Sequence, residues 1–262
     1  MKSRVIYTSI IGGTDSLMQP AAVDPSCDYI CFVRKGEAGT GRDGVWELRE
    51  LPVTIEDNRM LARYAKVHPH TLLKDYEWSV WMDGNLSVAG DGFYRAVQEC
   101  ISAGGVFHTV KHPLRDCTYE EAYACVGADK ESFSNALKVI NFLASECLPR
   151  HCGLYESSII LRAHNAPGVI SLDELWWSCL RTLSGRDQLS LVWCARKSEV
   201  GIGLLLPEGM NMRNSDFITY VDHQPAPRCS AGLQDFRKRI AQFLLRRRID
   251  AVDRKFQRQC PR

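Results

Sequence analysis

Short apolar runs alternate with amphipathic helical segments along most of this chain, and that alternation limits the folds it can adopt. The runs are rich in β-branched and aromatic residues and end at turn formers, as in residues 4–11 before Gly12-Gly13 and in residues 78–82 before Asp83. Strands separated by helices favour an α/β fold with a largely parallel sheet. The expected strands are 4–11, 29–33, 78–82, 106–110 and 157–162, and the expected helices are 57–66, 94–102, 116–125, 130–146 and 172–183.

The chain shows no internal repeat and no clear linker, so we expect one domain over residues 1–230 and a basic helical tail over residues 231–262. The net charge of +2 is unevenly spread: residues 235–262 hold ten Lys or Arg and three Asp, giving 10 − 3 = +7, which leaves 2 − 7 = −5 elsewhere. Apolar residues recur at helical spacing between these basic ones, as in helices that lie on anionic membrane surfaces. A solvated helix packed on the body is the alternative. Nucleic acid is not expected as a partner, because no reader motif is present.

Several protein classes are excluded by simple counts and motifs. No uncharged apolar run reaches the length of a membrane span, and no signal peptide precedes the first expected strand, so a cytoplasmic protein is expected. The 11 cysteines are odd in number, scattered and without a CxxC pair, which favours reduced, buried thiols over disulfides or a zinc site. The HExxH, GxSxG and Walker motifs are absent, which argues against the common metalloprotease, α/β-hydrolase and P-loop classes.

The tripeptide Asp83-Gly84-Asn85 follows an aromatic-rich run that we expect to form a buried central strand. Ligands of open α/β sheets bind beyond the carboxyl ends of the strands. An Asp there, a Gly that permits close approach and a second oxygen-bearing side chain could hold a hard divalent cation. A plain Asp-Gly turn is the alternative, since that dipeptide is common in loops.

Two further polar segments are candidates for a site. Arg186-Asp187-Gln188 follows an expected helix and forms either a capping or surface pair, or a pocket that faces a sugar or phosphate. A second cluster surrounds residues 117–119, where Pro113 and the strand-like context disfavour a helical pair of metal-binding histidines. Its members are His108, His112, Arg115, Glu120 and Glu121.

Segments in a fixed order along the chain carry a resemblance to a known family. They are residues 7–13, 28–32, 58–66, 69–70, 79–85, 112–121, 153–156, 176–177 and 184–190. Taken together they resemble the TOD/MUCI-type glycosyltransferase-like domain family, formerly a domain of unknown function. The resemblance covers about residues 4–225 and is more specific than any one motif. It implies a GT-A-like fold with a mixed, mostly parallel central sheet flanked by helices, and the basic tail lies outside it.

The resemblance also implies a site for a nucleoside diphosphate sugar. Asp83-Gly84-Asn85 occupies the place of a metal-binding DxD motif, with Asn85 instead of the second acid and His223 as a further ligand of Mn²⁺ or Mg²⁺. The residues expected near the nucleotide sugar are Tyr7 and Thr8 at the base and ribose, Gly12 and Gly13 in the adjoining turn, Arg59 and Lys66 at the phosphates or ribose, and Arg186.

Asp187-Gln188 resembles the DQ pair of retaining relatives of this fold. In that interpretation Asp187 binds sugar hydroxyls and Gln188 stabilises oxocarbenium-like charge. An inverting enzyme would instead need a carboxylate base at the acceptor hydroxyl, for which Glu156 and Glu120 are available. The residues expected at the acceptor are His112, Arg115 and Glu120.

These observations predict a glycosyltransferase that moves a hexose from a nucleoside diphosphate sugar to a surface-glycan or lipid-linked acceptor, with a divalent metal and a peripheral place on the membrane. Two alternatives stay open. One is a metal-dependent amidohydrolase similar to a ceramidase, for which no three-ligand zinc set is visible. The other is an inactive carbohydrate-binding domain, which Asn85 in place of an acid would permit. A resemblance of fold does not fix the donor or the acceptor.

Overall fold

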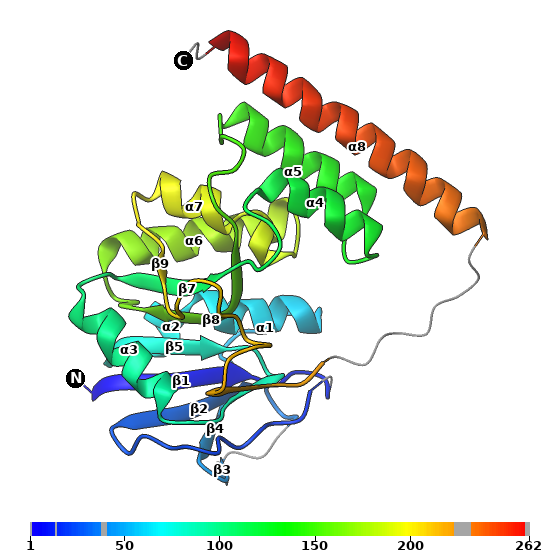
Figure 1. Ribbon diagram of the computed structural model, residues 1–262. Helices are drawn as coiled ribbons and strands as arrows, with labels where there is room; N and C mark the ends of the chain where they lie inside the picture. The colour runs from blue at the N-terminus through cyan, green and yellow to red at the C-terminus, as the bar shows by residue number, and fades with distance from the viewer. Residues whose placement is uncertain (1, 14, 38–40, 223–231, 260–262) are drawn as a thin grey trace. The chain divides into compact units, whose positions relative to one another are not determined.

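The computed structural model (Figure 1) describes residues 2–13, 15–37, 41–222 and 232–259. The chain divides into two compact units. The sheet unit comprises residues 1–113, 156–177 and 194–223, and the helical unit comprises residues 114–155, 178–193 and 224–262. This division differs from the expected boundary at residue 230, because the basic C-terminal helix belongs to the helical unit together with two earlier helices.

An eight-stranded sheet forms the centre of the sheet unit. Its order is β3 (Gly41–Asp43), β4 (Trp46–Glu50), β2 (Cys27–Val33), β1 (Lys2–Ser9), β5 (Tyr76–Met82), β8 (Tyr155–Arg162), β7 (Phe107–Lys111) and β9 (Gly203–Leu204). The pairs β1–β2, β1–β5, β2–β4 and β7–β9 are parallel, whereas β3–β4 and β5–β8 are antiparallel. A small antiparallel sheet joins β6 (Leu86–Val88) to β10 (Ile218–Tyr220). The mixed, mostly parallel sheet that the sequence predicts is confirmed.

The helices follow the expected order along the chain. The sheet unit contains α1 (Asn58–Val67), α2 (Pro69–Leu72) and α3 (Gly92–Ser102); the helical unit contains α4 (Thr118–Gly127), α5 (Phe133–Ser145), the 3₁₀ turn η1 (Asp187–Leu189) and α8 (Gly232–Gln259). Two more, α6 (Pro167–Thr182) and α7 (Leu191–Lys197), contain residues of both units. Asp57 caps α1 as expected, since its carboxylate accepts a hydrogen bond from the Met60 N–H at 2.8 Å. Helix α6 begins five residues before the expected start, because proline is well tolerated in a first helical turn.

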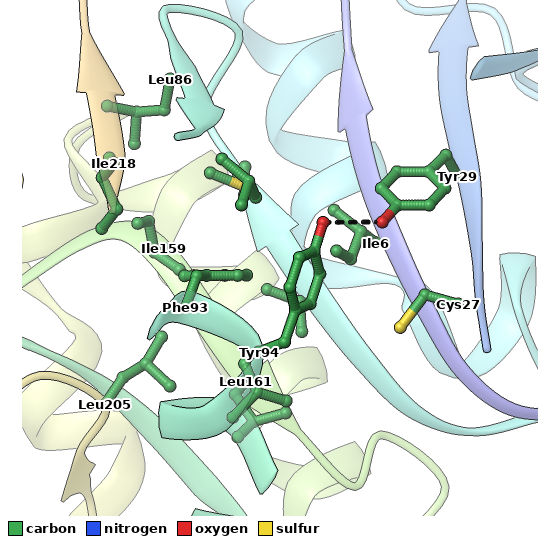
Figure 2. Close-up of a cluster of buried hydrophobic side chains, with 14 of the residues drawn as sticks. Ile6, Cys27, Tyr29, Leu86, Phe93, Tyr94, Ile159, Leu161, Leu205 and Ile218 are labelled. Carbon is green, nitrogen blue, oxygen red and sulfur yellow. Dashed lines mark hydrogen bonds between the residues drawn. The ribbon is translucent and has the colours of Figure 1, made fainter. Parts of the chain in front are cut away.

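The two faces of the sheet carry different helices, because successive side chains of a strand point to opposite sides. Ile6 of β1 joins a buried cluster with Phe93 and Val97 of α3 (Figure 2). Its neighbour Tyr7 points to the other face, where its hydroxyl donates to the carbonyl of Lys66 on α1 at 2.9 Å.

Figure 2 also shows the hydrogen bond between Tyr29 and Tyr94, a pair that binds the loop between β1 and β2. The Tyr29 and Tyr94 hydroxyls are 2.7 Å apart; Tyr94 donates to the Ala22 carbonyl at 2.7 Å, and Tyr29 accepts from the Asp24 N–H at 2.9 Å. Burial, together with the hydrogen bond to Tyr29, raises the pKa of Tyr94. The loop between β1 and β2 is therefore held to both β2 and α3.

Other expectations can be compared with the fold directly. The nine cysteines of the described chain are free, and six of them are buried, as the scattered spacing predicts. The glycines at 39, 41 and 44 match a GxGxxG spacing, but residues 41–43 form the edge strand β3 and lead to β4 rather than to a helix. None of the helices in the described residues is long and apolar enough to cross a membrane.

Candidate functional site

The carboxyl end of β5 places Asp83 at the edge of the sheet where β8 begins, because these two strands run antiparallel. The Asp83 N–H donates to the Ser158 carbonyl at 2.8 Å, and the Asp83 carbonyl accepts from the Leu86 N–H at 3.0 Å. Gly84 lies close to the end of β1: a Cβ atom there would be 2.8 Å from Ile10 Cδ1 and 3.2 Å from Asp15 Oδ2. The tripeptide is thus a turn, and it also presents a carboxylate at the edge where ligands of such sheets bind.

A buried lysine orients this carboxylate. Asp83 Oδ1 accepts hydrogen bonds from Lys66 Nζ at 3.2 Å and from Trp81 Nε1 at 2.7 Å. The Lys66 side chain is 0% exposed and also donates to Ser157 Oγ at 3.3 Å, whereas the Asp83 side chain is 30% exposed. The expected contact between Lys66 and a phosphate is therefore corrected: its ammonium group lies beneath Asp83, where it can fix the carboxylate but not reach a ligand.

A second ion pair, which is fully buried, contacts the backbone of Lys66. Arg162 and Asp173 are both 0% exposed, with Arg162 Nη1 at 2.6 Å from Asp173 Oδ1. Arg162 also donates to the Tyr7 hydroxyl at 2.6 Å and to the Lys66 carbonyl. Tyr7 is buried in this layer and Thr8 is buried on the opposite face of the sheet, so neither side chain is open to the expected base or ribose. Tyr7 instead fixes the end of α1, and burial raises its pKa.

The turn after β1 is exposed to solvent, unlike Tyr7 and Thr8 within the strand. Gly12 and Gly13 are exposed and have φ angles of +68° and +67°, which suit glycine. A Cβ atom on Gly12 would lie 2.0 Å from Asn58 Nδ2, so this turn touches the first residue of α1. Arg59 follows Asn58 and is exposed. The turn, Arg59 and the amino end of α1 together form an accessible edge, at which the Gly12 N–H donates to Glu37 Oε2 at 3.4 Å and Arg59 offers an exposed cation.

Arg213 is a cationic residue of the site that the sequence analysis missed. Its Nη1 lies 3.2 Å from Glu156 Oε1, and its guanidinium lies 4.8 Å from the centre of the Tyr220 ring. The Glu156 side chain is 9% exposed but that of Arg213 is 50% exposed, so the arginine can turn to an incoming anion. Tyr220 in turn donates to Asp222 Oδ1 at 2.6 Å. Arg213 lies outside any expected strand or helix, so no sequence pattern indicates it. Its place at the site is visible only from its ion pair with Glu156, which is distant in the sequence.

Asn85 holds the chain that leads to the expected histidine ligand. Its Nδ2 donates to the Val221 carbonyl at 2.9 Å, and its own carbonyl accepts from the Val221 N–H at 3.0 Å. His223 lies outside the described residues. Within the described residues no group of three or more His, Cys, Asp or Glu could hold a metal ion. Asp83 Oδ2 and Asn85 Oδ1 are oxygen atoms of the kind that Mg²⁺ binds together with phosphate and water, and a metal ion at this edge stays a prediction.

The Asp187-Gln188 pair belongs to the helical unit. Asp187 is buried at the start of η1, where its Oδ1 accepts from the Gln188 N–H at 3.2 Å. Arg186 lies near Cys125 of α4. Burial raises the pKa of the Cys125 thiol to about 12, and the positive charge of Arg186 acts in the opposite direction. The bond from Asp187 to the next residue is local and makes no helix cap, and the role of the pair at a sugar stays a prediction.

The residues expected at the acceptor separate into different surroundings. His112 is buried directly after β7 in the sheet unit. Arg115 donates to Glu121 at 2.5 Å in the helical unit. Glu120 bonds to Arg246 at 2.7 and 2.8 Å and to Arg150. Burial alone would raise the pKa of Glu120, but the hydrogen bond and charge of Arg246 lower it. A carboxylate held by two arginines is a poor general base, which corrects that expectation for Glu120.

Comparison with known proteins identifies the family. A family model described as TOD1/MUCI70, glycosyltransferase-like domain, matches residues 1–213. The chain belongs to the TOD1/MUCI70 family. No curated protein matches it. Among solved structures it is similar to the apo structure of the bifunctional glycosyltransferase WbbM, with 12% identity and a TM-score of 0.43. That similarity covers 78% of this chain and 38% of the WbbM chain, so this chain spans well under half of that protein.

The TOD1/MUCI70 match contains most of the edge described above, but Tyr220 and Val221 lie beyond it. It includes Lys66, Asp83 and Glu156 and ends at Arg213, whereas α8 lies beyond it. Both the resemblance inferred from sequence segments and the sheet that it implies are thereby confirmed. The glycosyltransferase-like character belongs to the matched domain, and the helix α8 requires a separate explanation.

Proposed function

We propose that this chain is a glycosyltransferase that moves a hexose from a nucleoside diphosphate sugar to a surface-glycan or lipid-linked acceptor. The observation that carries the proposal is the Asp83 carboxylate, which is 30% exposed at the carboxyl edge of a central strand and is oriented by buried Lys66. Orientation by a rigid scaffold is what a charge-stabilising site needs, because reorganisation during the reaction is costly. Membership of a glycosyltransferase-like family supports the same function.

Several residues of the chain would contact the metal ion and the diphosphate of the donor. Asp83 Oδ2 and Asn85 Oδ1, with His223 as a further candidate, would hold Mn²⁺ or Mg²⁺, and a bound divalent ion neutralises charge that develops on the leaving diphosphate. Arg213 is half-exposed beside Glu156 and would turn to the phosphates. Arg59, which is exposed next to the Gly12–Gly13 turn, offers a second cation.

The transfer forms a bond between the acceptor hydroxyl oxygen and C1 of the sugar. The bond from C1 to the β-phosphate oxygen breaks, and its electron pair leaves with the diphosphate. In a retaining reaction Asp187 would bind sugar hydroxyls, Gln188 would stabilise the charge at C1, and the departing phosphate oxygen would accept the hydroxyl proton. In an inverting reaction a carboxylate takes that proton, and Glu156 is the remaining candidate after Glu120. The resemblance of Asp187-Gln188 to a DQ pair favours retention.

A thermal-shift screen tests the donor site. The protein would be measured with UDP, GDP, CMP and their sugars, with and without Mn²⁺, because a ligand that binds the folded state raises the apparent stability. We expect a metal-dependent rise with one nucleotide, at least tenfold weaker affinity in Asp83→Ala, and no change in Asp75→Ala, an exposed aspartate before β5.

The outcomes separate the candidate functions. Transfer to an acceptor together with a nucleotide shift supports the glycosyltransferase. A shift without turnover against any sugar acceptor would indicate a binding domain instead. Absence of any shift would refute the proposed donor site. No observation favours the amidohydrolase, since no three-ligand set is present in the described residues.

A further inference from the structure

The C-terminal helix α8 has one face that is fixed to the body of the helical unit. Leu245, Ile249 and Val252 are buried where α8 packs against α4 and α5 (Figure 1). Polar contacts extend the attachment along the helix: Arg246 bonds to Glu120, Lys238 to Asp129 and Arg248 to Asn141. The tail is therefore a structural helix on this side, as one of the sequence alternatives supposes.

The opposite face of α8 carries a second apolar row that nothing in the described structure covers. Phe236 is 62% exposed, Ile240 44%, Phe243 59% and Leu244 46%. These four are among nine large hydrophobic side chains exposed in the described residues, so the helix holds almost half of them. At 3.6 residues per turn, Phe236, Ile240 and Phe243 lie within about 60° of one another and about 140–180° from Leu245. We refer to these four residues as the outer row.

Arg237 and Arg239 border the outer row on its two sides, and Arg247 lies within it. Arg237, Arg239 and Arg247 are exposed, and the Arg247 guanidinium lies 5.7 Å from the centre of the Phe243 ring. Residues 236–248 contain no Asp or Glu. Aromatic and aliphatic residues bordered by arginine are typical of helices that lie in the interface of a membrane with anionic lipids.

We propose that the outer row of α8 docks on the surface of an anionic membrane. The helix would lie parallel to the bilayer, with Phe236, Ile240 and Phe243 in the interfacial region and the arginines at the lipid phosphates. Because its other face stays attached to α4 and α5, docking requires no release of the helix from the body. The outer row spans residues 236–244, which gives an apolar contact about 12 Å long at 1.5 Å per residue.

The charge and the apolar character of the outer row favour a membrane over other partners for this face of α8. A second copy of this chain would bring two sets of arginines together, and like charges in an interface oppose association. Nucleic acid would pair with the arginines but would leave the apolar centre without a partner. A bilayer with anionic headgroups matches both parts of the surface. The proposal goes beyond the transferase function and can be tested without any activity.

Co-sedimentation of the full chain with vesicles tests the proposal. One set of vesicles is phosphatidylcholine alone, and the other contains about 30% phosphatidylglycerol. We expect binding to the anionic vesicles, a loss of at least tenfold in Phe236→Ser/Phe243→Ser, and a similar loss in Arg237→Glu/Arg239→Glu/Arg247→Glu. The matched control is Leu114→Ser, which removes a side chain that is 78% exposed outside α8.

Unfolding temperatures verify that the variants are folded, since exposed side chains contribute little to stability. Equal sedimentation with and without anionic lipid would overturn the proposal. Retained vesicle binding in the two-phenylalanine variant would overturn it as well, because charge alone would then explain the binding. A vesicle-free dimer that the same variant dissociates would assign the outer row to a second copy instead. Binding to RNA that ignores the phenylalanines would likewise contradict the membrane assignment.

Discussion

The pair formed by Lys66 and Asp83 should respond very differently to removal of each partner, because the two side chains differ in exposure. Lys66 is 0% exposed, so in Asp83→Ala its ammonium group loses its carboxylate in a place that water does not reach. Removing one partner of a buried pair typically costs about 3–5 kcal/mol. Asp83 is 30% exposed, so the lower end, about 3 kcal/mol, applies here.

The reverse change, Lys66→Met, should cost less than about 1 kcal/mol. Asp83 keeps the hydrogen bond from Trp81 Nε1 at 2.7 Å and remains open to water, while methionine fills the space of the lysine chain. The double variant should then be more stable than Asp83→Ala by about 2 kcal/mol, because the buried ammonium group that lost its carboxylate is no longer present. Stability would thus be recovered without recovery of the carboxylate.

Urea unfolding of the wild type, the two single variants and the double variant measures this cycle. A loss of about 3 kcal/mol corresponds to a fall of about 6–12 °C in unfolding temperature for a chain of this size. Asp75→Ala serves as the control for loss of an aspartate. Equal destabilisation by both single variants, or a double variant no more stable than Asp83→Ala, would refute the reasoning. The double variant also separates functions, since it should fold but bind no nucleotide in the metal-dependent way expected of the wild type.

Two further predictions concern buried groups of the sheet unit. Arg162→Met should destabilise the protein by about 3–5 kcal/mol in urea unfolding, because it leaves Asp173 buried without its partner, whereas Arg162→Met/Asp173→Leu should recover part of that loss. Burial lowers the pKa of His164 to about 4, so the unfolded chain takes up a proton near pH 6.5 that the folded protein accepts only near pH 4. The free energy of unfolding should therefore be intact above pH 6.5 and fall by up to about 3 kcal/mol as the pH drops to 4. In His164→Gln the free energy of unfolding, measured by urea titration between pH 4 and 6.5, should depend less steeply on pH, by the uptake of one proton. An unchanged pH dependence would contradict the assignment.

The central part of the fold was predictable because its signals are local. The run at residues 78–82 is apolar and aromatic and stops at Asp83-Gly84, which is enough to indicate a buried strand and its end. Asp57 precedes a helical pattern and caps it by contact with a residue three positions later. Short edge strands such as Gly41–Asp43 and Gly203–Leu204 carry no such pattern, because two or three residues cannot display a period.

The site was predictable only where one segment supplies it. Asp83 and Asn85 are close together in the chain, so their place at the sheet edge follows from the strand before them. Arg213 and Glu156 are 57 residues apart, and their pairing depends on how the chain after β9 returns to the sheet. Lys66 shows the same difficulty in another form. Its place on α1 is clear from periodicity, but periodicity cannot tell that the facing surface is Asp83 rather than solvent.

The way in which Asp83 is held constrains how a metal ion could be used at this edge. One of its oxygens already accepts two hydrogen bonds, one of them from the ammonium group of Lys66, so the carboxylate offers a single oxygen and a partly neutralised charge. Asn85 adds a neutral oxygen, and its amide nitrogen is engaged with Val221. A hard cation held by so little negative charge would take much of its coordination from the diphosphate itself. We therefore expect the metal ion and the nucleotide each to bind weakly alone and more tightly together. Arg213 would neutralise the part of the phosphate charge that the metal ion does not.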